Sequence, residues 1–209
     1  MGVSEARRAR GARALDGPPV SNINDAIARI PYVEPATAPE EVRQILERLP
    51  VKLNIFKLMA HAETCFRPLL SLGTAILSQQ QLSGKLRELA ILRVARLSGA
   101  EYEWVQHVPI AIGAGASEAQ VKALETGTIN DVSFDPVERL VLAFTTEVVE
   151  RVGATEATFR EMTQHFSSRE IVELILAIGF YMTVARLMET TRIDLDPPAG
   201  TAVVDSLRR

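Results

Sequence analysis

The chain has 209 residues, of which 47% are hydrophobic and 23% charged, and its net charge is −3. This composition is typical of a globular protein with a substantial core. The slightly acidic balance argues against general nucleic-acid binding, which needs a basic surface. The single cysteine, Cys65, cannot form an internal disulfide. We therefore expect a reducing, cytoplasmic compartment.

The sequence divides into three parts. Residues 1–20 carry four arginines followed by Gly17-Pro18-Pro19, without the apolar run of an export signal, and we expect a flexible arm. Residues 21–189 have the helical patterning of a single domain, and residues 190–209 have the composition of a carboxyl-terminal tail. The best membrane candidate, Ile171 to Leu187, contains Glu173 and Arg186, so we expect no membrane interaction.

Capping residues and apolar spacing predict a series of helices. Helix starts are indicated by Pro39, Asn54, Pro68, Ser83, Ser117, Asp135-Pro136, Thr155 and either Ser167 or Ser168. The expected helices, in chain order, cover about 39–49, 55–63, 69–77, 84–97, 101–113, a short segment after Ser117, 136–152, 155–165 and 168–188.

The sequence predicts an all-α fold. Alternating apolar runs joined by hairpin turns do not occur, and the short connections favour antiparallel helix neighbours. Gly115-Ala116-Ser117-Glu118-Ala119 is echoed by Gly153-Ala154-Thr155-Glu156-Ala157, and Arg87-Glu88 by Arg169-Glu170. The echo suggests either shared capping chemistry or an internal repeat of two helical hairpins.

The densest group of chemically useful side chains lies in the helix expected at 101–113. Glu103 and His107 are four residues apart and share one helix face. Glu88, on the preceding helix, could reach the same place. Carboxylates beside an imidazole are a common arrangement for general acid–base catalysis near neutral pH. The alternative is a solvated Glu–His pair that contributes little.

Leu86-Arg87-Glu88-Leu89-Ala90-Ile91-Leu92-Arg93-Val94-Ala95, followed by Gly99-Ala100-Glu101-Tyr102-Glu103-Trp104 and His107, resembles the core of the carboxymuconolactone decarboxylase family. The resemblance is clear over about residues 50–125. It implies an alkylhydroperoxidase D (AhpD)-like helical bundle and a homo-oligomer, either a trimer or a hexamer.

The resemblance also implies what the site lacks. Redox-active relatives have a Cys-x-x-Cys pair, whose positions fall on Ala100 and Glu103, while their glutamate and histidine fall on Glu88 and His107. Peroxide reduction in that branch needs one thiolate to attack and a second to resolve. This chain therefore resembles the non-redox branch, whose named member decarboxylates a lactone acid.

We accordingly expect a cofactor-independent, decarboxylase-like carbon–carbon lyase that acts on a small carboxylated or carbonyl compound from aromatic catabolism. His107, Glu88 and Glu103 are the candidate catalytic residues. The candidate substrate-binding residues are Tyr102, Trp104, Arg93 and Arg96, with Arg186 as a further arginine. One histidine and two carboxylates could also bind a metal, but we expect neither a metal nor a cofactor.

Two other functions stay open at this stage. One is an antioxidant protein of the alkylhydroperoxidase type, which the missing cysteine pair disfavours. The other is a non-catalytic helical assembly protein that has kept only the fold, and a closed or absent pocket around His107 would favour it.

Overall fold

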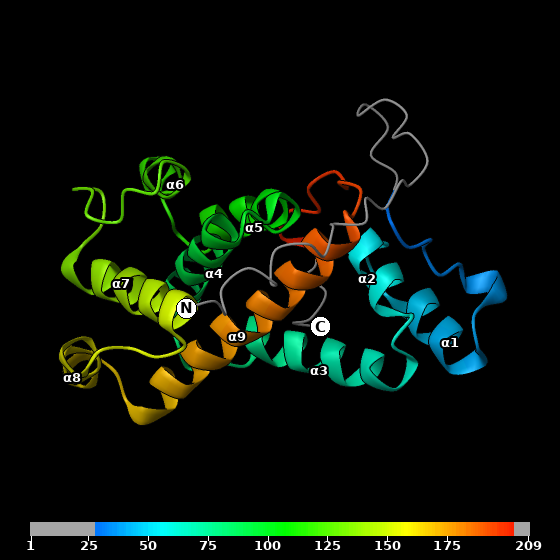
Figure 1. Ribbon diagram of the computed structural model, residues 1–209, viewed down its shortest axis with the longest axis horizontal. Coiled ribbons are helices and arrows are strands. Elements are labelled where there is room, and N and C mark those ends of the chain that lie inside the picture. Colours follow the sequence, from blue (N-terminus) through cyan, green and yellow to red (C-terminus); the bar gives the residue numbers. More distant parts are fainter. Residues whose placement is uncertain (1–27, 203–209) are drawn as a thin grey trace, which may run out of the picture.

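A computed structural model describes residues 28–202. Within this range the chain forms helices joined by short connections and contains no strand (Figure 1). The all-α prediction is confirmed. The arm expected at residues 1–20 lies outside the described residues, as does the end of the expected tail beyond residue 202.

The helices follow one another closely along the chain. They are a short 3-10 helix, η1 (Pro35–Thr37), and the α-helices α1 (Glu40–Arg48), α2 (Asn54–Met59), α3 (Glu63–Ser78), α4 (Gly84–Ser98), α5 (Glu101–Gly113), α6 (Glu118–Glu125), α7 (Pro136–Arg151), α8 (Glu156–His165) and α9 (Ser168–Thr191).

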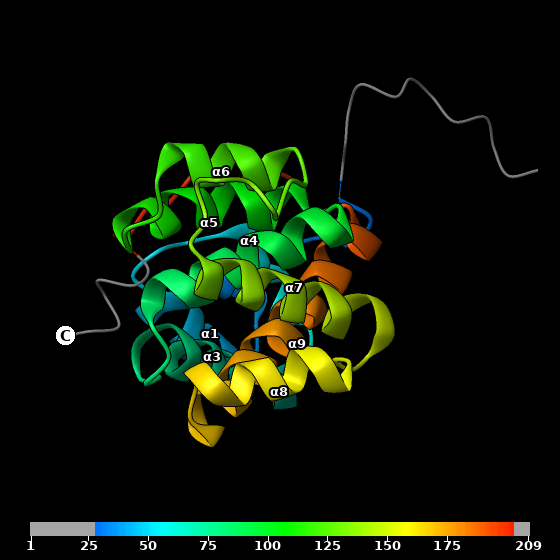
Figure 2. The same cartoon turned by 90° about the vertical axis from the view of Figure 1, so that its left-hand side faces the viewer.

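Helix α4 forms the centre of the molecule. Every residue from Arg87 to Ala95 is buried, because α5, α7 and α9 all pack against this helix (Figures 1 and 2). A helix covered on all sides must be apolar around its whole circumference. The charged pair Arg87 and Glu88 is an exception inside this buried run, so both side chains need partners within the protein.

Helix α9 crosses the molecule beside α4 (Figure 1). Among the described helices it alone has the length and apolarity that would also suit a membrane crossing. One side of α9 packs into the core through Leu174, Ala177 and Ile178, which are at most 1% exposed. This buried side is typical of a core helix, and core helices often have the same apolar composition as membrane-spanning helices.

Most predicted helix starts are confirmed. Ser117, Asp135 and Ser167 each accept a hydrogen bond from the backbone three residues later, and the side chain at that third position bonds back. These reciprocal bonds satisfy backbone N–H groups that have no partner within the helix. Ser83 does precede α4 as predicted, but its side chain forms no capping hydrogen bond.

Two predicted starts are wrong. Asn54 is the first residue of α2 and does not cap it. Pro68 lies inside α3, which begins at Glu63. A proline in a helix removes one backbone hydrogen bond. Here that loss is outweighed by tertiary packing, because the turn before Pro68 carries Phe66, which is completely buried.

The sequence echo corresponds to two helix starts. Ser117 caps α6 and Thr155 caps α8 through the same side-chain bond. The Arg–Glu pairs differ, since Arg87 and Glu88 are buried whereas Arg169 is exposed. The echo therefore reflects shared capping chemistry at these two positions.

Candidate functional site

The α4–α5 hairpin brings the predicted glutamate and histidine together. The two helices meet at Gly99, whose φ of 66° lets the chain reverse, and Ala100 leads into α5. His107 Nδ1 then lies 2.8 Å from Glu88 Oε2. Glu88 is completely buried and His107 is 8% exposed. The expected pairing of these residues is therefore present in the structure, in a shielded environment.

Arg87 holds Glu88 from the other side. Its Nε and Nη2 atoms each lie 3.0 Å from Glu88 Oε1, and Nη1 donates to the Ile76 carbonyl at 3.4 Å. An arginine that donates twice to one carboxylate oxygen supplies two charge-assisted hydrogen bonds, which fix the position of that carboxylate. The Glu88 carboxylate then accepts from His107 Nδ1–H, which fixes the ring tautomer and orientation.

The remaining ring nitrogen of His107 is unused. Within residues 28–202, Nε2 has no hydrogen-bond partner. The Tyr181 ring from α9 meets the imidazole edge to face, with ring centroids 4.7 Å apart. Arg87, Glu88 and Tyr181 thus determine the position of the imidazole, while Nε2 stays available for proton exchange with a ligand.

Glu103 has an unusual environment. It is 2% exposed, and neither of its carboxyl oxygens has a hydrogen-bond partner among the described residues. Burial is the main reason why the pKa of this carboxyl is raised well above 4.5, and the charges of Glu189 and Glu88 raise it further. Glu103 is therefore a protonated acid over a range of pH where ordinary glutamates are ionised.

Glu103 and His107 line one cavity of about 160 Å³. The space is large enough for one ring-sized molecule. Its walls come from the α1–α2 connection and from α2, α3, α5 and α9, and they are largely apolar. They include Leu53, Phe56, Met59, Leu70, Phe180 and Met188.

Tyr102 also lines the cavity, but its hydroxyl group has a structural partner. The hydroxyl donates to Asp196 Oδ2 at 2.5 Å, and the same oxygen accepts from the backbone N of Asn54 at 2.6 Å. Burial and the nearby Asp196 carboxylate raise the pKa of Tyr102. The predicted role of this hydroxyl in contacting substrate is thus weakened, since the bond to Asp196 occupies it.

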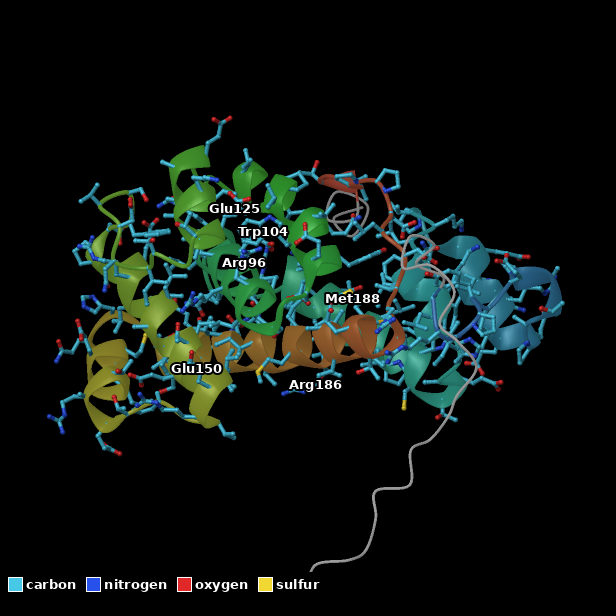
Figure 3. All side chains as sticks on the ribbon, turned by 45° about the horizontal axis from the view of Figure 1, so that its top comes forward. Arg96, Trp104, Glu125, Glu150, Arg186 and Met188 are labelled. Carbon is cyan, nitrogen blue, oxygen red and sulfur yellow. The ribbon has the colours of Figure 1, made fainter. Side chains whose placement is uncertain are left out.

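Trp104, Arg93 and Arg96 are not brought to the cavity. Arg96 lies over the Trp104 ring, 5.1 Å from its centroid, on the side of α5 that faces α6 (Figure 3). Arg93 donates to Thr146 on α7. These three residues lie on faces of α4 and α5 that pack toward α6 and α7. Arg186 is exposed on α9 and donates to its own helix. The prediction of an arginine that binds substrate is therefore corrected.

Sequence reasoning missed several residues of the site. Arg87 entered only the echo and the family-like run and was given no role in the site, although its position next to Glu88 in a largely apolar helix is a signal for a buried ion pair. Tyr181 could not be placed, because its contact with His107 joins α5 to α9 across the fold. Asp196 and Gly200 fall in the segment expected to be a tail, yet both reach the site.

Metal and thiol chemistry find little support in this part of the chain. Among residues 28–202, no group of three His, Cys, Asp or Glu side chains is arranged to hold a metal ion. Cys65 is exposed in the first turn of α3 and does not line the cavity. The two positions expected for the cysteine pair hold Ala100 and Glu103.

The fold and the α4–α5 site define an AhpD-like helical protein. Residues 64–147, which carry Glu88 and His107, match the carboxymuconolactone decarboxylase family model. This match covers less than half of the chain, so it shows a similarity of this region to that family, while the solved structures show an AhpD-like fold. No curated protein sequence matches the chain.

Solved structures confirm the fold. An uncharacterized peroxidase-related protein from Ralstonia eutropha JMP134, which has an alkylhydroperoxidase AhpD core, superposes with a TM-score of 0.70 at 20% identity over 81% of this chain and 93% of that chain. A peroxidase-related protein from Silicibacter sp. TM1040 gives 0.68 at 18% identity over 86% and 96%. The debrominase Bmp8 in complex with 2,3,4-tribromopyrrole gives 0.65 at 17% identity over 88% and 98%.

Proposed function

We propose that this protein is a cofactor-independent lyase of the carboxymuconolactone decarboxylase type, which transfers a proton to or from carbon in a small carboxylated or carbonyl compound. The observation that carries this proposal is the buried Arg87–Glu88–His107 series, which ends at an apolar cavity, where His107 Nε2 has no partner among the described residues. An oriented imidazole facing an apolar cavity is suited to general acid–base catalysis.

In a decarboxylation, the bond between the substrate carbon and its carboxylate breaks and carbon dioxide leaves. The electron pair moves into a conjugated carbonyl and forms an enolate. The protonated His107 then donates its Nε2 proton to carbon, which restores the carbonyl, and the ring regains a proton from solvent. Glu88 and Arg87 act as positioning residues, because they hold the ring without touching the substrate.

The charge of the site is compatible with this chemistry. Two ionised acids beside one histidine would repel an anionic substrate. The Arg87 charge offsets that of Glu88, and Glu103 is held neutral by burial. Protonated His107 is then the excess charge of the site, and it can pair with one substrate carboxylate.

The test uses His107→Gln, with the exposed His61→Gln as the matched control. Ring-sized lactone acids and β-keto acids are incubated with each protein in deuterium oxide, and carbon dioxide release and carbon deuteration are followed. We expect His107→Gln to lower turnover at least about 100-fold, with an unchanged helical circular dichroism spectrum. Wild-type turnover that survives this substitution would refute the proposal.

Glu88→Gln tests the positioning role separately. The amide cannot carry the charge that pairs with Arg87, so we expect slower turnover together with a changed tautomer signal of the imidazole in nitrogen NMR spectra. A purely structural role for Glu88 would lower stability without changing that signal in the folded protein.

A further inference from the structure

Glu103 brings a buried carboxyl to the wall of the cavity. Both of its oxygens are buried and unpaired among the described residues, although the side chain lines the cavity. A buried polar group without a hydrogen bond costs free energy, and native proteins rarely keep one without a use. A ligand in the cavity is the natural source of the missing partner.

We propose that Glu103 is a substrate-binding catalytic acid, which donates a hydrogen bond to the carbonyl oxygen of an uncharged group on a ring-sized, apolar substrate. This inference rests on the proposed function for its catalytic consequence, whereas the binding preference can be measured independently. The substrate is thereby oriented with its carbonyl at Glu103 and its reacting carbon toward His107.

The environment of Glu103 explains why it donates. As described above, burial raises the pKa of this carboxyl, and the neighbouring charges of Glu189 and Glu88 act in the same direction. Arg87, the nearby cation, donates to Glu88 and the Ile76 carbonyl. A carboxylic acid kept neutral in this way can donate a hydrogen bond that strengthens as the carbonyl oxygen becomes negative.

The spacing on α5 allows one ligand to reach both groups. Glu103 and His107 are one helical turn apart, so their Cβ atoms lie roughly 6 Å from each other. A carbonyl oxygen and the carbon two bonds away fit between the two side chains, each at hydrogen-bonding range. The charge that forms on oxygen and the proton that goes to carbon are then handled by different residues.

The walls of the cavity favour an uncharged group at the Glu103 end. The described lining residues include no lysine or arginine, so an anionic oxygen placed there would lose hydration without gaining a cation. Leu70, Phe180 and Val184 supply apolar surface for a ring. A ring-bearing ketone or lactone is consequently the substrate class that matches both ends of the site.

The experiment compares acetophenone with α-methylstyrene, which has the same shape but a methylene group in place of the carbonyl oxygen. Affinities are measured by calorimetry for the wild type, Glu103→Gln and Glu103→Leu. We expect the wild type to bind acetophenone about tenfold more tightly than α-methylstyrene. Glu103→Gln keeps this preference because its amide also donates, whereas Glu103→Leu reverses it.

The comparison of acetophenone with α-methylstyrene in the wild type keeps the inference testable in case Glu103→Leu fails to fold. Equal affinities for the two compounds in the wild type, or the same preference in Glu103→Leu, would each overturn the inference.

The result is distinguishable from that of the proposed function. Suppose that His107→Gln keeps turnover, while the preference for acetophenone over α-methylstyrene is lost only in Glu103→Leu. The lyase proposal then fails, and the binding role of Glu103 stands. If His107→Gln abolishes turnover and the preference for acetophenone is the same in Glu103→Leu as in the wild type, only the inference about Glu103 fails.

Discussion

At the scale of single residues, Glu103 shows how one buried side chain can serve binding at the expense of stability. Its carboxyl is buried, and neither oxygen has a hydrogen-bond partner within residues 28–202. The free-energy cost of burying Glu103 on folding depends on pH. The unfolded chain can release the carboxyl proton above pH 4.5, whereas the folded protein retains it.

We therefore predict that the free energy of unfolding of the wild type falls, relative to that of Glu103→Gln, as pH rises above 4.5. A group whose folded-state pKa is raised contributes most at low pH and loses this contribution as pH rises. The difference should grow by up to about 1.4 kcal/mol per pH unit. Urea denaturation at several pH values measures it, with exposed Glu63→Gln as the control. A pH-independent difference would contradict a retained proton.

The site residues differ in how far the sequence could place them. Glu88 and His107 were predictable, because the helical spacing and the family resemblance placed both on one hairpin. The arginines could not be chosen correctly from sequence. Arg93 and Arg96 lie on the same helix as Arg87, but only Arg87 turns toward Glu88. Such orientation depends on the packing of α5 and α7 against α4.

At the scale of helices, local signals predicted most starts, and tertiary packing decided the exceptions. Ser117, Asp135 and Ser167 cap their helices through bonds that lie within a few residues. Pro68 gave an equally strong local signal, yet α3 runs through it because Phe66 is anchored in the core. A contact between distant segments has no signature in the window around a proline.

The end of α7 supports a stability prediction. Val152 terminates this helix with a φ of 66° and is 92% exposed. A β-branched residue is strained in this left-handed conformation, which glycine adopts freely. Val152→Gly should therefore raise the free energy of unfolding by about 1 kcal/mol.

Thermal denaturation checks the value, and Val132→Gly is the control. Val132 is 96% exposed but has no left-handed backbone. Glycine there only increases the entropy of the unfolded chain, so we expect no stabilisation. An equal effect of both substitutions would argue against strain at the end of α7.

At the scale of the whole molecule, segments from both ends of the described chain are joined next to the cavity. Tyr32 donates to Asp194, and Asp196 accepts from Asn54 and Tyr102. The Gln106 side chain adds bonds to the backbone of Asp196, Pro197 and Ala199. The proline and glycine content of residues 190–209 had indicated a tail. Composition cannot show that this segment has hydrogen-bond partners 90 or more residues away in the chain.

We predict that Asp196→Ala lowers the free energy of unfolding by about 1–3 kcal/mol, since it leaves the buried Tyr102 hydroxyl unpaired. Amide hydrogen exchange should accelerate in residues 194–202 first. Asp131→Ala, which removes a carboxylate–backbone bond at a residue that does not line the cavity, is the control. Unchanged exchange in residues 194–202 would show that Asp196 does not anchor this segment.

The path of the chain also determines the order in which the site can mature during synthesis. Glu88 and His107 leave the ribosome early and can pair as soon as their hairpin forms. Tyr181 and Gly200, which complete the walls, follow many residues later. A nascent chain thus acquires its acid–base pair before it has anywhere to hold a ligand, and small molecules can assist folding only in its final steps.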